Sequence, residues 1–178
     1  MKEQRQSQSM NSPCEIKQHH YLLIISCSKR KRGGTMNPAL QIYDGPVYRA
    51  LRKRIGYLGP GKVRVFIISA KYGLIPAERV IENYDEKITL ERAMELNANV
   101  LESLRDILTI GNCKGVFVNL GSKYCAAIRG IEQILPPGLS IGYACGGIGK
   151  RTSQTIQWLE NVISSTSVLQ KEYKIHFI

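Results

Sequence analysis

Serine and lysine side chains follow two short apolar runs of the sequence, and these polar turns could bind a ligand or carry chemistry. One run covers residues 21–26 and leads into Ser28 and Lys29, and the other covers residues 63–69 and leads into Lys71. Each run is apolar on both faces and lacks a helical period, which is typical of a buried strand in a parallel sheet. Because ligands of open α/β sheets bind at the carboxyl ends of the strands, the two turns predict a site.

A candidate catalytic carboxylate, Asp85, lies in the stretch of residues 71–87, whose length and irregularity indicate a functional loop. The preceding Tyr84 could stack on a nucleobase, and the carboxylate could activate water or stabilise a cation. The alternative is that Asp85 caps the next helix or pairs with Lys87.

A glycine-rich turn at residues 146–149 is followed directly by two cations. Glycine leaves backbone N–H groups accessible, and together with a helix N-terminus and nearby cations they can bind a phosphate. The spacing matches neither the P-loop nor the dinucleotide fingerprint, since Ala144 stands where a P-loop requires glycine. Two interpretations remain, a tight turn with exposed side chains or a phosphate site made of Gly147, Gly149, Lys150 and Arg151.

The chain has three histidines, His19, His20 and His176, all near its ends. A Ser-His-Asp triad, an HExxH zinc protease and an HxE zinc deaminase therefore lack the residues that they need. Cys27 could act as a nucleophile, but without an internal histidine as its base a packed cysteine is the favoured interpretation. Five cysteines without a CxxC pair argue against zinc and structural disulfides and favour a reducing cytoplasm. We expect neither a metal nor a cofactor.

The net charge of +11 is concentrated in one segment, because residues 21–62 hold nine Lys and Arg against one acid, Asp44. A basic cluster beside a strand-end site favours a polyanionic partner, and nucleic acid is the common one. The alternative is a basic surface that serves solubility. If nucleic acid binds, its backbone is expected to meet the cations of the two polar turns, Lys29, Arg30, Lys31, Arg32 and Lys71.

At 178 residues with 43% hydrophobic content, the chain is expected to form one globular domain. Residues 1–18 are polar and lack periodicity, so we expect a flexible arm before a single domain that spans residues 19–178. No apolar run approaches the roughly 20 residues that cross a bilayer, and the N-terminus lacks the apolar region of a secretory signal. Nothing in the sequence indicates a membrane or an obligate protein partner.

Strands that alternate with helices predict a three-layer α/β/α sandwich around a mostly parallel sheet of four to five strands. The expected strands cover residues 21–26, 63–69, 115–120 and 139–144, with a short edge strand at 174–178. The expected helices cover residues 47–55, 89–108, 122–135 and 152–164.

Four motifs stand in a fixed order in the first half of the chain. They are Ile-Ser-Cys-Ser-Lys-Arg-Lys at residues 25–31, Ile-Tyr-Asp-Gly-Pro-Val-Tyr at 42–48, Ile-Ser-Ala-Lys-Tyr-Gly-Leu-Ile at 68–75 and Val-Ile-Glu-Asn-Tyr-Asp at 80–85. This series resembles the small YaaA-related domains, a group similar in fold to the uracil-DNA-glycosylase superfamily and to base-exchange accessory domains of tRNA modification. The resemblance implies a uracil-DNA-glycosylase-like fold and a nucleic acid or nucleobase as ligand.

The chain also departs from the classical glycosylases. Their Gly-x-Asp-Pro-Tyr motif is replaced after the first expected strand by Ser-Cys-Ser-Lys at residues 26–29, and the later His-Pro-Ser type motif is absent.

Some of the YaaA-related domains are associated with defence against phages that carry modified bases. The resemblance therefore implies a DNA N-glycosylase that excises a modified base and leaves an abasic site, in anti-phage defence, with a catalytic set of its own.

In such an enzyme Asp85 is the expected catalytic carboxylate, because a carboxylate near the anomeric carbon stabilises the oxocarbenium ion and orients water. Asn119, at the end of the third expected strand, could read a base edge within the catalytic set or simply form the turn. Hydroxyl-bearing side chains are expected to bind the base, namely Ser28, Tyr43, Tyr48, Tyr72 and Tyr84. Two alternatives stay open, a non-catalytic nucleic-acid-binding module and a protein that binds a free nucleotide or nucleoside.

Overall fold

The computed structural model describes residues 20–33, 36–57, 61–110 and 112–173. The strands are β1 His20–Ser26, β2 Met36–Pro38, β3 Val63–Ser69, β4 Gly73–Pro76, β5 Val80–Glu82, β6 Cys113–Asn119 and β7 Ser140–Tyr143. Five of them form one sheet in the order β4-β3-β1-β6-β7, in which β4 alone is antiparallel to its neighbour. The short strands β2 and β5 pair separately and antiparallel.

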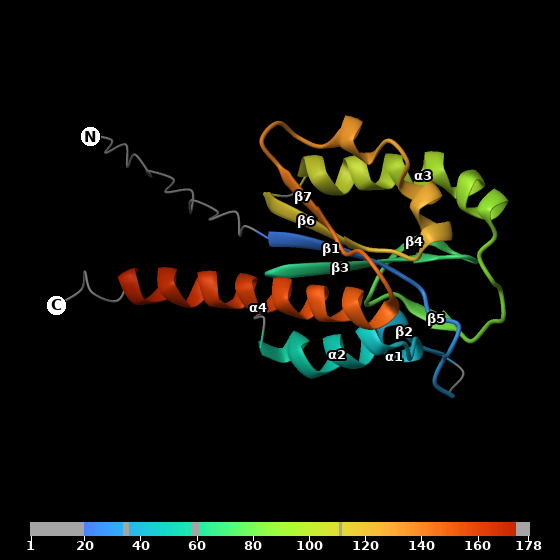
Figure 1. Cartoon of the computed structure of the whole chain (residues 1–178), viewed down its shortest axis with the longest axis horizontal. Helices are drawn as coiled ribbons and strands as arrows, with labels where there is room; N and C mark the ends of the chain where they lie inside the picture. Colours follow the sequence, from blue (N-terminus) through green and yellow to red (C-terminus); the bar gives the residue numbers. More distant parts are fainter. Residues whose placement is uncertain (1–19, 34–35, 58–60, 111, 174–178) are drawn as a thin grey trace, which may run out of the picture.

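Helices cover both faces of the sheet, as Figure 1 shows. One face carries α3 (Leu90–Ile110) and the short 3-10 segments η2 (Ser122–Ile128) and η3 (Ile131–Ile134). The other face carries α1 (Ala39–Ile42), α2 (Pro46–Arg54) with the following η1 (Ile55–Tyr57), and α4 (Ile148–Tyr173). The expected α/β architecture, with a mostly parallel central sheet flanked by helices, is confirmed.

The central strand β1 is apolar at residues 22–25 because a helical layer covers each of its faces. Leu22 and Ile24 pack in the cluster that contains α3, whereas Leu23 and Ile25 pack in the cluster of α1, α2 and α4. All four side chains are fully buried, and each such burial stabilises the fold by roughly 1.5–3 kcal/mol. The unbroken apolar run is therefore the signature of a central parallel strand.

Most of the expected elements are found close to their predicted bounds. The four main expected strands correspond to β1, β3, β6 and β7, and the first two expected helices correspond to α2 and α3. Thr89 caps α3, because its Oγ1 accepts a hydrogen bond of 3.1 Å from the backbone N–H of Arg92. Helix α4 begins at Ile148, so Gly149 and Lys150 belong to its first turn and not to a preceding loop.

Two expectations about local structure are wrong. Residues 71–87 are not an irregular loop, because β4 folds back on β3 at Gly73, whose φ of +69° suits glycine, and β5 follows. Residues 122–135 do not form one α-helix, because Gly130, with a φ of +89°, separates two short 3-10 segments that pack against α3.

The expected arm at residues 1–18 and the expected edge strand at 174–178 lie outside the described residues, and β4 supplies the fifth strand of the sheet. Within the described part of the chain, no helix combines the length and the apolar character needed to span a bilayer.

Candidate functional site

A pocket of about 260 Å³ opens at the carboxyl ends of β1 and β6. The topology explains its position: the chain leaves β1 toward α2 on one face and leaves β6 toward η2 on the other, so a crevice opens between neighbouring strands. Ser28, Lys29, Asn119 and Arg151, which lie far apart in the sequence, meet here. The full lining is Ser26, Cys27, Ser28, Lys29, Arg30, Gly45, Pro46, Val47, Tyr48, Asn119, Ile148, Arg151 and Thr152.

Helix α2 brings its N-terminus to this pocket. Pro46 stands at its start, where a missing N–H costs nothing and the fixed φ of proline favours the helix. The preceding Gly45 allows the helix to approach the turn after β1, since a Cβ there would lie 3.1 Å from Ser28 Oγ. No side chain caps this end, so its remaining N–H groups and its positive dipole end are available at the pocket.

Helix α4 brings a second N-terminus, and two contacts fix it to the end of β6. The Asn119 amide donates to Thr155 Oγ1 at 2.9 Å, and Arg151 Nη1 donates to the carbonyl of Leu120. Arg151 Nε is buried without a hydrogen-bond partner among the described residues, so the guanidinium keeps an unsatisfied donor at the pocket wall. Two helix N-termini and three cationic side chains thus converge on one cavity.

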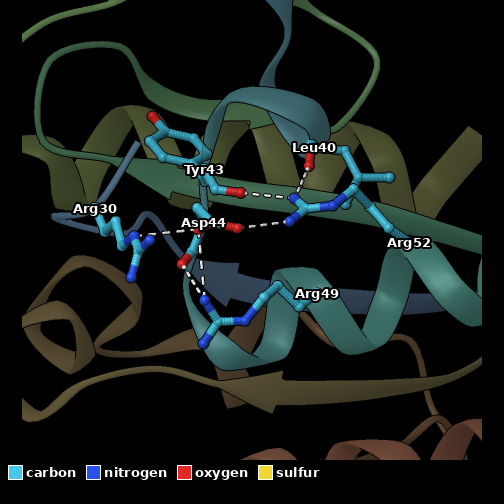
Figure 2. Close-up of polar contacts among 6 residues, drawn as sticks. All are labelled: Arg30, Leu40, Tyr43, Asp44, Arg49 and Arg52. Atoms are coloured by element: carbon cyan, nitrogen blue, oxygen red, sulfur yellow. Dashed lines mark hydrogen bonds and ion pairs between the residues drawn. The ribbon is translucent and has the colours of Figure 1, made fainter. Parts of the chain in front are cut away.

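Asp44 forms ion pairs with three arginines beside the pocket, as Figure 2 shows. Its carboxylate lies 2.8 Å from Arg52, 3.2 Å from Arg30 and 3.4 Å from Arg49. Partial burial opposes ionisation, but the hydrogen bond from Arg52 and the charges of Arg49 and Arg30 outweigh it and hold the pKa of the carboxyl below its ordinary value. One negative charge therefore faces three positive charges, and the cluster stays cationic.

The basic turn after β1 is held in place by its backbone. The N–H of Asp44 donates to the carbonyl of Arg30 at 2.9 Å, the N–H of Arg32 donates to Ile42 at 2.7 Å, and Lys31 forms a β-bridge with Tyr43. The side chain of Arg30 nevertheless stays 76% exposed. A fixed backbone thus presents charged side chains that remain accessible to an anion.

Three tyrosine hydroxyls form hydrogen bonds behind this turn. Tyr84 Oη lies 2.7 Å from both Tyr43 Oη and Ser69 Oγ, and Tyr48 Oη donates to the carbonyl of Ser26 at 2.8 Å. Tyr43 is 0% and Tyr48 1% exposed, so neither ring offers an open face on which a base could stack, although Tyr48 belongs to the pocket lining. Burial raises the pKa of Tyr43 to about 12 and also raises that of Tyr84, which keeps both hydroxyls neutral hydrogen-bond partners.

The sequence does not single out two residues near the pocket, Tyr124 and Asp44, as members of a site. Cys27 Sγ lies 2.9 Å from the hydroxyl of Tyr124 in η2, and the 97 residues between them leave no local signal of the contact. Asp44 does leave a signal, since it is the single acid of the basic segment 21–62. A single carboxylate in a strongly basic segment is expected to form ion pairs with several of the surrounding cations.

Other expected site residues lie outside the lining. Asp85 is exposed, and the described lining residues include no carboxylate. Lys71 pairs with Glu82 at 2.6 Å, and this hydrogen bond raises the pKa of Lys71 and lowers that of Glu82. Four further expected residues are exposed and lie outside the lining, namely Arg32, Gly147 in the turn before α4, and Gly149 and Lys150 in the first turn of that helix. Among the described residues, no three His, Cys, Asp or Glu side chains gather as a metal site would require.

Comparison with known proteins places the chain in a family. Residues 22–161 match the family of unknown function DUF6884, and the chain belongs to this family. It is also similar to the crystal structure of AF0587, a protein of unknown function, with 16% sequence identity and a TM-score of 0.47. That match covers 79% of this chain and 44% of the other, so the chain spans less than half of that protein's length. No curated protein matches the sequence.

Proposed function

We propose that this domain binds nucleic acid and takes one nucleotide, phosphate included, into the pocket at the carboxyl edge of its sheet. The observation that carries the proposal is the convergence of the N-termini of α2 and α4 with Lys29, Arg30 and Arg151 around one cavity. Each helix N-terminus carries the equivalent of roughly half a positive charge. Such an arrangement favours a phosphate group.

The walls of the pocket suit the rest of a nucleotide. Pro46, Val47 and Ile148 supply apolar surface, and Ile148 is 61% exposed, so a base or sugar could cover it. Ser28 and Asn119 supply polar groups that can hydrogen-bond to a base edge. A few polar groups on a mainly apolar surface are the usual composition of a ligand site.

The charges around the pocket favour a polymer over a free nucleotide. Arg30 and Arg49 are 76% and 50% exposed, and Lys31 and Arg32 continue the basic turn away from the pocket. One bound nucleotide would leave most of these cations unused, whereas the phosphates of a strand can engage several of them and release counterions.

Base excision remains a separate prediction. An oxocarbenium ion requires a nearby anion, and the described lining residues supply no carboxylate. If the domain excises a base, the carboxylate has to come from outside the lining, and Asp85 is the candidate that the sequence resemblance indicates.

The proposal is tested by titrating labelled DNA and RNA oligonucleotides with the protein at several salt concentrations. We expect the logarithm of affinity to fall steeply with the logarithm of salt concentration, and Lys29→Ala to reduce that slope by about 1. Lys114→Ala is the matched control, because Lys114 is exposed at the opposite, amino end of β6. Equal slopes for the two variants, or no binding of either nucleic acid, would overturn the proposal.

The same protein should be incubated with plain and hypermodified phage DNA and assayed for free bases by mass spectrometry. Release of a base that Asp85→Asn abolishes, with oligonucleotide binding intact, would support the glycosylase. Binding without any base release would leave a nucleic-acid-binding module.

A further inference from the structure

A patch of two tyrosines and three cations lies next to the basic turn and outside the pocket lining. Tyr72 and Tyr84 meet edge to face, with ring centroids 5.3 Å apart and an angle of 85° between the rings. Lys31 Nζ lies 4.2 Å from the centroid of Tyr84, and Lys71 and Arg79 lie 5.2 Å and 5.4 Å from that of Tyr72. We call these five residues the aromatic patch.

One serine contacts both tyrosines of the aromatic patch. Ser69 Oγ lies 2.7 Å from the hydroxyl of Tyr84 and accepts a hydrogen bond of 3.1 Å from the backbone N–H of Tyr72. Both tyrosines are partly buried, and Tyr84 also rests edge-on against the buried Tyr43. The Tyr84 ring is thus held in a fixed position, and the Tyr72 ring packs against it edge to face, which lowers the entropy cost of stacking a ligand on them.

The aromatic patch already holds an anion from the same chain, the carboxylate of Glu82. Glu82 accepts hydrogen bonds from Lys71 Nζ at 2.6 Å and from the hydroxyl of Tyr72 at 3.4 Å. A phosphate oxygen would use the same two donors. Since the Glu82 side chain is 59% exposed, an incoming phosphate can compete with it from solvent.

The aromatic patch is continuous with the pocket. Lys29 and Arg30 line the pocket, and Lys31, the next residue, lies over the ring of Tyr84. The Cα atoms of residues 29 and 31 are at most about 7 Å apart. A strand that places one nucleotide in the pocket can therefore reach the aromatic patch with a neighbouring nucleotide.

We propose that the aromatic patch is a second nucleotide subsite, so that the partner of this domain is a single-stranded nucleic acid. The inference rests on the proposed function of the pocket. Stacking on Tyr72 or Tyr84 requires a base with a free face, which a single strand offers and a paired duplex does not. The cations over the rings move to the phosphates as the base takes their place.

The experiment measures binding of a labelled oligothymidylate of about twelve nucleotides and of a duplex of the same length. We expect the strand to bind more tightly than the duplex. Tyr72→Leu should weaken strand binding by about tenfold, the loss expected for one stacked base. Tyr72→Phe keeps the ring and loses only the weak hydroxyl donor, so it should retain most of the strand binding that Tyr72→Leu loses.

Glu82→Gln has an effect of opposite sign, because it removes the anion that competes with phosphate. We expect strand binding to tighten by up to about fivefold, the range of an exposed ion pair. Glu160→Gln is the matched control for the change in net charge, since Glu160 pairs with Arg54 at 3.4 Å and is 57% exposed.

The two proposals fail in different ways. Unchanged strand binding in Tyr72→Leu, or equal binding of strand and duplex, would overturn the second subsite. If Lys29→Ala still reduced the salt slope in that case, the pocket would keep its proposed function. Absence of oligothymidylate binding in the unmodified protein would overturn the second subsite, and the pocket proposal would fall with it if duplex DNA and RNA did not bind either.

Discussion

The Asp44 carboxylate and the Arg52 guanidinium lie 2.8 Å apart, and their side chains are only 12% and 13% exposed. Arg52 also donates to the carbonyls of Leu40 and Tyr43, at 2.9 Å and 2.8 Å, at the end of α1 (Figure 2). A single guanidinium therefore joins α1, α2 and the residue that precedes Gly45. This contact fixes the start of α2, which forms one wall of the pocket.

Asp44→Asn should lower the stability of the domain, because it leaves three arginines without their anion. The pKa of Asp44 is depressed below 3.8 in the folded protein, so its contribution is complete above that value and is lost as pH falls through the folded pKa. At neutral pH we expect the Tm of Asp44→Asn to lie a few degrees lower. The difference from the unmodified protein should shrink in strong acid. Thermal unfolding across the acid range measures it, and equal Tm values at neutral pH would contradict the structural role.

Gly45→Ala should obstruct the pocket, since the added Cβ would lie 3.1 Å from Ser28 Oγ. Alanine is also a poorer N-cap than glycine, so a stability loss of up to about 1 kcal/mol is expected. The informative measurement is oligonucleotide affinity under conditions in which the variant is fully folded. Gly56→Ala is the control, because a Cβ there meets nothing within 4 Å. Affinity that falls equally in both variants, or in neither, would argue against this pocket as the binding site.

His20 should make the domain sensitive to mild acid. It is 6% exposed at the start of β1, and its Nε2 is buried without a hydrogen-bond partner among the described residues. Burial and the charge of Arg64 lower its pKa from 6.5, so the unfolded chain binds the proton more readily and stability falls as pH drops below 6.5. Urea unfolding between about pH 8 and pH 5 should show this loss, and His20→Gln should reduce it. An equally steep loss in His20→Gln would assign the effect to another group.

Tyr43→Phe should cost about 1 kcal/mol, the typical contribution of a hydrogen bond in a folded protein. The variant removes the 2.7 Å contact between the Tyr43 and Tyr84 hydroxyls and leaves the ring packing in place. Tyr143→Phe is the matched control, because its hydroxyl donates to Glu132 at 2.6 Å in exposed surroundings and should matter less. Urea unfolding compares the two, and a larger loss in Tyr143→Phe would contradict the importance of the buried contact.

The parallel strands could be predicted because their signal is local. Residues such as Leu23 and Ile24 point to opposite faces, and both are apolar only when both faces are covered. The conformation of the segment 122–135 is harder to predict, since it depends on packing against α3 and on the positive φ of Gly130. Neither is visible in the spacing of apolar residues.

The candidate site, too, contains residues that the sequence could predict and residues that it could not. Ser28, Lys29 and Arg151 could be found because each follows a strand or begins a helix, and the topology then brings such ends together. Tyr124 could not, because its contact with Cys27 joins distant segments. Asp85 is exposed and outside the pocket lining, although the preceding Tyr84 contacts Ser69 at the end of β3.

The pocket is assembled from two parts of the chain that are distant in sequence. Its lining comes from residues 26–48 and from residues 119–152, with β3, β4, β5 and α3 between them. A ligand that bridges the two parts binds only when both are folded, so its binding energy adds to the cooperativity of unfolding. A bound nucleic-acid strand should therefore slow amide hydrogen exchange along β1 and β6 together. Exchange of these backbone amides would then show whether the pocket is occupied.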